Sequence, residues 1–454
     1  MKVVILTGGI GSRLWPLSTK DCPKPFLCIQ EEVSLIEQTT KRALLLCDPS
    51  DLIFVTDETY VSFVEMHVHK MCTRATILTE PMGKNTAPAV VLALCFLQEI
   101  GYEEDVLFMP VDSFIEKEAA FAQSMRNASM RKNKDKLLLF GHVPHKIDEG
   151  LGYLVLGKQE GNYFVLEKFI EKPCKEEIEA LSSTHRVVWN MGHLLGNVTT
   201  LQKSLSRHHA WCREALLLRY TEAQRCFETF PEISLDHALL EKNEDLEVCL
   251  LTGVWCDLGS FDNIYDVLEK DVYGNICRGS VHTEHVQNSM LWSNDLPIVA
   301  HHIDHLSVVV TKEVIYVGKR GYSQEVRKLS QECALSRKVL RPWGFYVVLE
   351  ESSHRKIKKI VVKPYARLSL QMHRYRKEHW TVLQGTAFVE REDENFFLNQ
   401  EDSISIPIQA KHRLSNVTDH WLEVLEVQSG SVVWEDDIIR LEDDYTRALC
   451  SENA

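Results

Sequence analysis

The sequence lacks the marks of a secreted or membrane protein. Its 13 cysteines include no Cys-x-x-Cys pair, and several lie in apolar runs, as Cys95 does in AVVLALCFL. The longest apolar run, 87–97, is too short to cross a bilayer. The opening MKVVILTGG reaches glycine too early for a signal peptide. These absences predict a reduced, soluble, cytoplasmic protein that keeps its thiols buried and has no membrane partner.

Positive charge is also scarce. The 454 residues include 51 lysines and arginines against 65 acidic residues, which gives a net charge of −14. This balance argues against a nucleic-acid partner, but it allows a local basic cleft for phosphates. The sequence has no low-complexity tract and no evident repeat of fixed period. It is too long for one compact domain, so we expect two or three.

A glycine-rich loop follows the first apolar run. The run, 3–6, is typical of the first strand of an α/β sheet, whose carboxyl edge binds ligands. In the loop GGIGSRLWPLSTKDCPKPF, glycines let the backbone bring its N–H groups close to a phosphate, and two cations suit a triphosphate. The candidate nucleotide-binding residues of this loop are Gly8, Gly9, Gly11, Ser12, Arg13 and Lys24.

Two common phosphate-binding motifs are missing from this loop. It does not end in Gly-Lys-Ser/Thr, so it is not a P-loop. No glycine falls three residues after Gly11, so it is not the dinucleotide-binding fingerprint either. Taken alone, the glycines are equally well explained as an ordinary turn with solvated basic residues.

Short apolar strands alternate with helical segments up to about residue 267. We expect strands over 52–55, 106–110 and 137–141, and helices over 34–47 and 87–100. This alternation is typical of a mostly parallel sheet with helices on both faces. Beyond it, the sequence predicts a small all-β segment over 272–321, a connecting helix and linker over 322–340, and a small β-barrel from 341 to about 435.

Two aspartates lie where a divalent cation could assist phosphate chemistry. Asp112 follows the strand 106–110, and Asp257 precedes a Gly-Ser turn in WCDLGSF. In phosphate chemistry Mg²⁺ is held by one or two carboxylates together with phosphate oxygens. An aspartate after a strand is also a common helix cap, so both roles stay open. Asn85 and Thr86 cap the helix that follows them, and the N-terminus of a helix offers N–H groups to a ligand.

Together these segments resemble the sugar-nucleotide pyrophosphorylases, whose signature is Gly-Gly-x-Gly-x-Arg-Leu followed by Pro-Lys. The tryptophan and Pro-Leu-Ser after Arg13-Leu14 are similar to the mannose-1-phosphate guanylyltransferases of the long bacterial type, which carry a second, isomerase-like domain. The resemblance covers nearly the whole chain. It implies an α/β fold with a Rossmann-like nucleotidyltransferase domain over 1–267, a short left-handed β-helix-like segment and linker over 268–334, and a cupin β-barrel over 335–454.

The resemblance also implies roles for residues of the first domain. It makes Arg13, Lys24, Asp112 and Asp257 catalytic, assigns Mg²⁺ to the two aspartates, and adds Asn85, Thr86 and Asp112 to the nucleotide site. It places a sugar phosphate near Gly152, Glu171, Lys172, Asn190 and Asp257, and it also matches Tyr153, Asp236 and Glu241. Lys84 replaces an arginine of the family, Leu151 a tyrosine and Met191 a serine.

The implied reaction needs no general base. Its nucleophile, a sugar-1-phosphate oxygen, is already ionised at neutral pH, so the task is to bring two anionic phosphates together. Cations and loop amides that neutralise the α-phosphate and the departing pyrophosphate account for the rate. We therefore expect no catalytic histidine or cysteine in this site.

A second candidate site lies in KPYARLSLQMHRYRKEHWTVLQGTAFVE. Alternate residues of a predicted strand share one face, and three later residues can converge on that face once a barrel closes. These residues are Gln371, His373 and Tyr375, followed by Glu378, His379 and His412. Such a set suits Zn²⁺ or another divalent metal, whereas a single histidine on a strand is more often a surface or core residue.

The wider segment, 341–445, resembles the type II mannose-6-phosphate isomerase domain. Tyr365 stands in place of a family glycine, and Tyr375 replaces the second histidine of the family motif. The metal ligands that the resemblance implies are nevertheless present, namely Gln371, His373, Glu378 and His412. An isomerase needs a base near C1 and C2 and a metal that polarises their oxygens. Arg440 is a candidate substrate contact.

Three functions stay open on the sequence alone. The first is a two-activity enzyme that makes GDP-mannose and pyrophosphate from GTP and mannose-1-phosphate and also interconverts mannose-6-phosphate and fructose-6-phosphate. The second keeps the transferase and treats the cupin as a structural or assembly module. The third is a non-catalytic regulatory paralogue that binds a nucleotide sugar, although such a protein would be expected to lose Arg13 or a metal-binding aspartate. A homo-oligomer is compatible with all three.

Overall fold

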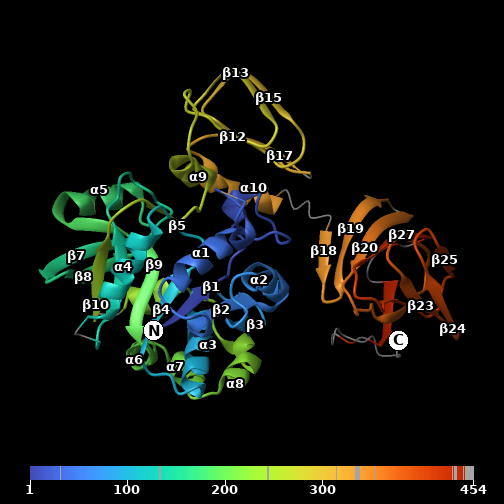
Figure 1. The fold of residues 1–454 in the computed structure, drawn as a ribbon, viewed down its shortest axis with the longest axis horizontal. Helices are drawn as coiled ribbons and strands as arrows, with labels where there is room; N and C mark the ends of the chain where they lie inside the picture. Colours follow the sequence, from blue (N-terminus) through green and yellow to red (C-terminus); the bar gives the residue numbers. More distant parts are fainter. Residues whose placement is uncertain are drawn as a thin grey trace. The chain divides into compact units, whose positions relative to one another are not determined.

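A computed structural model describes the chain except for residues 31, 132–133, 243–244, 313, 333–337, 353, 432, 434–436, 443 and 445–454. The chain forms two compact units, Met1–Cys333 and Ala334–Ala454 (Figure 1). The predicted boundaries at residues 267 and 334 stay predictions.

A nine-stranded sheet lies at the centre of the first unit, in the order β3-β2-β1-β4-β9-β6-β10-β8-β7. In chain order these strands are β1 (Lys2–Leu6), β2 (Leu52–Asp57), β3 (Thr76–Glu80), β4 (Asp105–Pro110), β6 (Leu137–His142), β7 (Tyr153–Glu160), β8 (Tyr163–Ile170), β9 (Arg186–Asn197) and β10 (Leu246–Leu251). All four strands predicted in this part of the chain are confirmed, as β1, β2, β4 and β6. Strands β3, β2, β1 and β4 pair in parallel, so their carboxyl ends meet at one edge.

The expectation of a mostly parallel sheet holds for all but two strands, since β6 and β10 in the other half also pair in parallel. Strand β9 runs antiparallel to β4, β6 and β7, and β8 runs antiparallel to β7 and β10. The turn between β7 and β8 holds Gly161 at a φ of 65°. So short a connection joins only antiparallel strands, because a parallel pair needs a crossover of a dozen or more residues.

Helices cover both faces of the sheet, as predicted (Figure 1). Val4 packs with α3 and α6 on one face, whereas Val3 and Ile5 pack with α1, α2 and α4 on the other. The helices are α1 (Leu35–Leu44), α2 (Val61–Val68), α3 (Thr86–Glu99), α4 (Glu118–Ser129), α5 (Lys175–Thr184), α6 (Val198–His208), α7 (Ala210–Ala215), α8 (Tyr220–Arg225), α9 (Phe261–Val267) and α10 (Val326–Glu332). Short helical turns are η1 (Ser12–Leu14), η2 (Lys24–Phe26), η3 (Pro49–Asp51), η4 (Glu58–Tyr60), η5 (Phe227–Thr229), η6 (Asp236–Leu240) and η7 (Ser323–Glu325).

Both predicted helices are confirmed, as α1 and α3. Helix α1 begins after Ser34, whose hydroxyl accepts the Glu37 N–H while the Glu37 carboxylate accepts the Ser34 N–H. This reciprocal capping satisfies two donors that the helix itself cannot use.

Two stacked ladders form the β-rich segment that follows α9. Its strands are β12 (Ile276–Arg278), β13 (Val281–Gln287), β14 (Met290–Ser293), β15 (Ile298–Asp304), β16 (Leu306–Val310) and β17 (Ile315–Lys319). Val281 pairs in parallel with Ile298, and Met290 with Ser307, seventeen residues apart in each case, whereas Ile276 and its parallel partner Met290 are fourteen residues apart. This unequal spacing agrees with the expectation of no repeat of fixed period, and paired positions such as His282 and Val299 also differ in residue type.

The second unit consists of two antiparallel sheets. One has the order β18-β19-β20-β27-β22-β25 and the other β24-β23-β26-β21-β28. The strands are β18 (Lys338–Arg341), β19 (Gly344–Glu351), β20 (Arg355–Val362), β21 (Leu370–His373), β22 (Arg376–Gln384), β23 (Ala387–Arg391), β24 (Glu394–Leu398), β25 (Ser403–Ile406), β26 (His412–Asn416), β27 (Leu422–Gly430) and β28 (Ile438–Glu442). Trp380 and Val382 of the first sheet share a core with Val389 and Leu414 of the second, as expected of a cupin.

The cysteines agree with the expectation of reduced thiols, but the expectation that the thiols are buried is wrong for Cys28, Cys174, Cys226 and Cys277, which are exposed. Every cysteine in the described part of the chain is free, and burial raises the pKa of Cys95 to about 12. Among the described residues, no helix is both long and apolar enough to span a membrane.

Candidate functional sites

The glycine loop is shaped by two left-handed residues. Gly9 and Gly11 have φ angles of 96° and 76°, which side chains rarely allow. A Cβ atom on Gly11 would lie 2.5 Å from Cβ of Lys24, so a larger residue would also displace that lysine. The N–H of Lys24 donates to the carbonyl of Ile10 at 3.0 Å. The backbone around Gly11 is therefore held against Lys24, which brings the two ends of the loop together.

Lys24 connects the two aspartates that the sequence predicts as metal ligands. Its Nζ donates to Asp112 Oδ2 at 2.6 Å and to the carbonyl oxygen of Asp257 at 2.7 Å. A short antiparallel ribbon, β5 (Phe114–Ile115) with β11 (Trp255–Cys256), brings the two segments together. The side chain of Lys24 is 7% exposed and that of Asp112 is 34% exposed. Asp112 thus balances a buried charge and is still accessible to a ligand. We call Arg13, Lys24, Asp112 and Asp257 the strand-edge site.

The carboxylate of Asp257 is held in a fixed orientation. Its Oδ1 accepts Asn263 Nδ2 at 2.7 Å and the Gly259 N–H at 3.0 Å. Both bonds end on Oδ1, so Oδ2 of Asp257 and the carboxylate of Asp112 are the oxygens available to a cation. Carboxylate oxygens supplemented by phosphate oxygens are the donors that Mg²⁺ prefers, so this set fits the ion. The assignment of Mg²⁺ to these residues stays a prediction.

Arg13 has two neighbours that the sequence did not reveal. Its Nη1 donates to Gln324 Oε1 at 2.8 Å, from a turn far outside the predicted site. Asp148 is the second: burial raises the pKa of its carboxyl, although the charges of Lys146 and Arg13 act in the opposite direction. No pattern of adjacent residues marks Asp148 as a neighbour of Arg13. No motif marks Gln324.

Glu80 is a further acidic residue that sequence reasoning missed. It ends β3, at the same sheet edge as the glycine loop, and is 5% exposed. Its Oε1 has no hydrogen-bond partner within the described chain. Burial, and then the nearby charge of Asp57, raise the pKa of Glu80 to about 8. A buried acceptor without a donor needs an explanation, either an ordered water or a ligand that donates a hydrogen bond.

The polar groups at the N-terminus of α3 form hydrogen bonds within the protein, which the sequence does not predict. The N–H of Thr86 donates to Asn85 Oδ1 at 2.9 Å, and the N–H of Ala87 to the Ile233 carbonyl at 3.2 Å. The Thr86 hydroxyl accepts the Leu235 N–H at 2.7 Å. These groups tie α3 to the 233–235 segment, so a nucleotide-binding role for Asn85 and Thr86 stays a prediction.

The structure brings together four residues predicted to bind the sugar phosphate, joined by Asp236. A Cβ atom on Gly152 would lie 2.8 Å from Glu171 Oε2, so glycine lets that carboxylate approach. Asn190 donates through its N–H to the Gly152 carbonyl at 2.8 Å and through Nδ2 to Asp236 Oδ1 at 3.3 Å. Lys172 pairs with Glu171. Burial, followed by the charge of Glu171, raises the pKa of Asp236 to about 6.

Two other residues of the predicted motifs make contacts within the protein. The hydroxyl of Tyr153 accepts the Asp148 N–H at 3.0 Å and lies 3.2 Å from the Asp148 carbonyl, to which it donates. Glu241 pairs with His237 at 3.0 Å, one helical turn earlier. Tyr153 therefore fixes the turn that carries Asp148, whereas Glu241 belongs to a partly exposed surface pair.

Three buried side chains of the second unit converge as metal ligands do. His373, Glu378 and His412, which we call the barrel site, place their ligand atoms within 4.8 Å of one another. His373 Nε2 lies 2.9 Å from Glu378 Oε1. In the described chain, neither that nitrogen nor His412 Nε2 has a partner in hydrogen-bonding geometry. Two orphaned imidazole nitrogens beside a carboxylate fit a divalent metal such as Zn²⁺.

Surrounding groups orient these side chains. His412 Nδ1 donates to the Ala410 carbonyl at 2.9 Å, which turns Nε2 toward Glu378. The Glu378 carboxylate accepts three further bonds, from Gln428 Nε2 (3.0 Å), Trp380 Nε1 (3.2 Å) and Arg376 Nε (3.2 Å). Burial acts to raise the pKa of Glu378, but the charges of His373 and His412 beside it bring that pKa well below its usual value. The carboxylate is thus kept in the ionised form that a metal ligand needs.

The other residues predicted for this metal site lie in different environments. Gln371 pairs with His412 across the β21–β26 ladder, and its Oε1 accepts the Ser369 hydroxyl at 3.1 Å. Its role as a fourth ligand stays a prediction. Tyr375 is 52% exposed, so it does not fill the barrel site. His379 is also exposed and contacts Ser405 Oγ at 3.0 Å, so the prediction that it converges with the others is wrong. It neighbours Glu378 on a strand, where successive side chains point to opposite faces.

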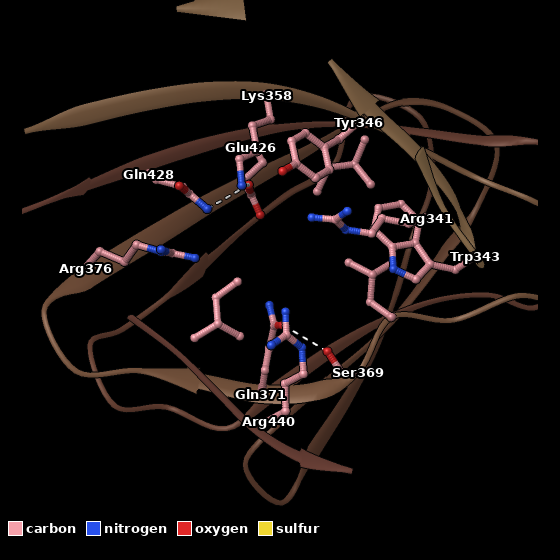
Figure 2. Close-up of a pocket in the computed structure, with 13 residues that line it drawn as sticks. Arg341, Trp343, Tyr346, Lys358, Ser369, Gln371, Arg376, Glu426, Gln428 and Arg440 are labelled. Atoms are coloured by element: carbon pink, nitrogen blue, oxygen red, sulfur yellow. Dashed lines mark hydrogen bonds and ion pairs between the residues drawn. The ribbon is translucent and has the colours of Figure 1, made fainter. Parts of the chain in front are cut away.

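A cavity lined by cations opens beside the barrel site. Its lining includes Arg341, Lys358, Arg376, Arg440, Gln371 and Glu426. Figure 2 shows the guanidinium groups of Arg341, Arg376 and Arg440 turned toward this space. Burial, and then the charge of Glu378, raise the pKa of Glu426 to about 8, although Lys358 lowers it. A cavity with four cations and one weakly acidic carboxyl suits an anionic ligand.

Comparisons with known proteins agree with this geometry in both units. Residues 2–273 match the sequence model of the family described as Nucleotidyl transferase, and residues 328–443 match that of Mannose-6-phosphate isomerase C-terminal. The alginate biosynthesis protein AlgA of Pseudomonas aeruginosa is 35% identical over 98% of this chain and 97% of its own length. The mannose-1-phosphate guanylyltransferase of Escherichia coli K12 is 32% identical over 98% of each chain.

The chain belongs to the nucleotidyl transferase family. A solved structure described as mannose-1-phosphate geranyltransferase from Thermus thermophilus is also similar, with a TM-score of 0.66 and 25% identity over 73% of this chain and 99% of that chain. This nucleotidyl transferase carries an isomerase-type second unit, since residues 328–443 match that family model. The predicted resemblance to the long mannose-1-phosphate guanylyltransferases is thereby confirmed.

This nucleotidyl transferase departs from the family motif at Lys84. Its Nζ donates to the carbonyls of Phe230, at 2.6 Å, and Glu228. The lysine therefore holds the segment after α8 against the start of α3. A single ammonium is sufficient for this contact with carbonyl oxygens, whereas the planar fork of an arginine is suited to carboxylates and phosphates.

Proposed function

We propose that this nucleotidyl transferase transfers GMP from GTP to mannose-1-phosphate and forms GDP-mannose and pyrophosphate. The observation that carries the proposal is the contact of Lys24 with both Asp112 and Asp257, beside a glycine loop at the carboxyl edge of β1. Relatives that match over nearly their whole length support the choice of substrates.

The charges of the strand-edge site account for the chemistry. Mg²⁺ held by Asp112 and Asp257 would neutralise charge on the reacting phosphates. Arg13 and the N–H groups of the glycine loop bind the oxygens of GTP, and Lys24 orients Asp112 while adding positive charge. Because the nucleophilic phosphate oxygen is already ionised, no residue has to remove a proton from it.

Glu80 is suited to recognise guanine. The guanine ring presents an N–H and an amino group side by side, and one carboxylate accepts both. Glu80 ends β3, two strands from β1, so its backbone lies about 10 Å along the edge from the start of the glycine loop. Hydrogen bonds donated to the carboxylate favour its ionised form, so binding would release the proton that burial retains.

The sugar-1-phosphate fits the cluster around Glu171. Glu171 and Asp236 accept hydrogen bonds from sugar hydroxyls, Asn190 both donates and accepts, and Lys172 supplies charge for the phosphate. Gly152 leaves the space that Glu171 occupies. These assignments follow the predicted motifs.

The test is pyrophosphate release measured over a panel of nucleoside triphosphates and sugar-1-phosphates, with and without Mg²⁺. We expect release only with Mg²⁺, and fastest with GTP and mannose-1-phosphate. Equal or faster turnover with another nucleotide would contradict the guanine assignment. No turnover with any pair would favour the non-catalytic alternative.

A second proposed activity is the interconversion of mannose-6-phosphate and fructose-6-phosphate. The observation that favours it is the barrel site beside a cation-lined cavity. Arg341, Lys358 and Arg440 are suited to bind the phosphate, and Glu426 supplies the carboxyl that moves a proton between C1 and C2. A metal on His373, Glu378 and His412 would polarise the two sugar oxygens.

Metal analysis of the full chain, combined with an assay that converts fructose-6-phosphate to mannose-6-phosphate, tests this second activity. Bound metal with turnover supports two activities in one chain. Bound metal without turnover indicates a relic site. A barrel that binds no metal supports the alternative in which the second unit is a structural or assembly module.

A further inference from the structure

The segment that follows strands β12 to β17, which we call the β-coil, contacts the glycine loop. Turn η7 follows β17, and its Gln324 accepts a hydrogen bond from Arg13 Nη1 at 2.8 Å. Beneath this contact, Leu14 of η1 and Val326 of α10 are buried in one hydrophobic core with Tyr316 of the coil. The hydrogen bond between Arg13 and Gln324 is therefore supported by buried side chains of both segments, so it does not join two unsupported loops.

Turn η7 is itself anchored. The carboxylate of Asp262 on α9 accepts the Gly321 N–H at 2.8 Å, the Ser323 N–H at 3.3 Å and the Ser323 hydroxyl at 2.5 Å. Three hydrogen bonds to one carboxylate fix the backbone on both sides of Tyr322. The Gln324 side chain is thus presented to Arg13 from a defined position.

Gly150 lies where three polar side chains meet. A Cβ atom there would be 2.8 Å from Gln324 Nε2, 3.0 Å from Arg13 Nη1 and 3.1 Å from Asp148 Oδ1. The guanidinium of Arg13 is therefore confined between a carboxyl from the start of the sugar subsite and an amide from η7. Gly259, which follows Asp257, also approaches it closely, since a Cβ atom there would be 3.1 Å from Arg13 Nη2.

We propose that Gln324 is a positioning residue for nucleotidyl transfer and holds the Arg13 guanidinium toward the phosphates. The proposal rests on the transferase function argued above. An amide oxygen fixes the guanidinium without cancelling its charge, which a carboxylate in the same place would do. The segment after the β-coil thus contributes a residue to a site whose predicted members all lie before residue 262.

The first experiment measures the reactivity of Arg13 in the full chain without substrate. Phenylglyoxal labels arginine, and the rate of labelling at Arg13 is followed by peptide mass spectrometry. We expect Gln324→Ala to raise that rate about tenfold, because it removes a hydrogen bond to a charged group. Gln324→Glu should keep the wild-type rate, since a carboxylate also accepts the bond. Glu325→Gln, an exposed neighbour in the same turn, is the matched control. An unchanged labelling rate in Gln324→Ala overturns the proposal whatever the enzyme's activity.

The second experiment measures pyrophosphate release from GTP and mannose-1-phosphate. Gln324→Ala should lower kcat about tenfold while KM for mannose-1-phosphate changes less than about twofold. Gln324→Glu should also lower kcat, because it holds Arg13 but neutralises it. In an Arg13→Ala background, Gln324→Ala should have less than about a twofold further effect, because the two residues act as one unit.

The outcomes separate this inference from the proposed function. Faster labelling with normal kcat, or a full tenfold loss in the Arg13→Ala background, overturns the positioning role. If the wild-type chain releases no pyrophosphate from this substrate pair, the proposed function fails, and the labelling rates still decide whether Gln324 holds Arg13.

Discussion

The strand-edge site and the barrel site are assembled over different distances along the chain. Arg13 and Lys24 come from one loop, but their hydrogen-bond partners lie 88, 233 and 311 residues away. In contrast, His373, Glu378 and His412 lie on three strands of one small unit. The first site gathers fixed charges at the edge of a large sheet, and the second encloses titratable groups within a barrel. Losing one charge should therefore disable the first, whereas losing one buried ligand should empty the second.

Replacing either aspartate of the strand-edge site should have the largest effect. Asp112→Asn or Asp257→Asn removes an anionic oxygen from the Mg²⁺ donor set, and pyrophosphate release should fall on the order of 10²-fold or more. The assay uses saturating Mg²⁺ on protein shown to be folded by circular dichroism, with the exposed Asp304→Asn as a control. Near-wild-type turnover in folded Asp257→Asn would remove that residue from the metal site.

Substitutions in the barrel site should impair its metal binding and leave the activity of the strand-edge site nearly unchanged. His373→Ala or His412→Ala should lower metal affinity on the order of 10²-fold and abolish isomerisation. Pyrophosphate release should stay within about threefold, because the two sites share no residue. Metal content and both activities are measured on the full chain. His379→Ala is the matched control, since this neighbouring histidine faces away from the site. A parallel loss of both activities would show that the sites are coupled.

Arg13→Ala separates binding from chemistry within the strand-edge site. Its charge acts most strongly on the phosphates as they react, so kcat should fall about 10–10²-fold while KM for mannose-1-phosphate changes little. Initial rates at varied concentrations of each substrate measure the two effects. A change confined to KM for the sugar would place the arginine in the other subsite.

Glu80 offers a test through pH. The pKa of Glu80 is about 8 in the folded chain, compared with an ordinary glutamate pKa of 4.5 in the unfolded chain. Between these two pH values the folded chain therefore keeps a proton that the unfolded chain has released. That contribution to stability is complete below pH 4.5 and is lost as pH rises through 8. Glu80→Gln should therefore raise the melting temperature by several degrees relative to wild type at pH 8.5, and much less at pH 5. Calorimetry at both values, with the exposed Glu58→Gln as a control, checks this. An equal shift at both pH values contradicts the buried-proton explanation.

Replacing Tyr365 should have the smallest effect of these changes, on the stability of the second unit. Tyr365 has a φ of 57° and is 74% exposed, at the position where the family motif has glycine. Tyr365→Gly should stabilise the second unit by about 1 kcal/mol, because glycine adopts this conformation without strain. Tyr375→Gly, at an exposed position without a positive φ, should destabilise it instead. Thermal unfolding measures both. Destabilisation by Tyr365→Gly would mean that the tyrosine makes contacts outweighing its strain.

Sequence patterns predicted correctly those features that depend on interactions between adjacent residues. The apolar run before Gly8, the capped helix after Ser34 and the aspartate after β4 each follow from a few adjacent residues. The reversed strands β8 and β9 were missed, because alternation of strands and helices does not specify the direction of a long strand such as β9. The β-rich segment was predicted, but its parallel pairing was not, because its paired positions are similar in burial rather than in residue type.

The missed site residues share one property. Glu80, Asp148 and Gln324 are ordinary residues whose importance arises only from what distant segments place beside them. A buried carboxyl without a donor, or an amide against a guanidinium, leaves no signature in neighbouring letters. By contrast, the ligands of the barrel site were predictable, because a strand places alternate residues on one face and three of the four implied ligands fall within eight positions.

Arg13 and Gln324 leave the ribosome far apart in time. They are 311 positions apart, and at about 5–20 residues per second that interval takes roughly 15–60 s to synthesise. Strands β1 to β4 can pair during this time, so the growing chain presents the glycine loop before turn η7 exists. A chain stalled before the β-rich segment would carry Arg13 without the amide of Gln324. If Gln324 positions Arg13 as proposed, full activity is reached only after turn η7 has been synthesised and packed.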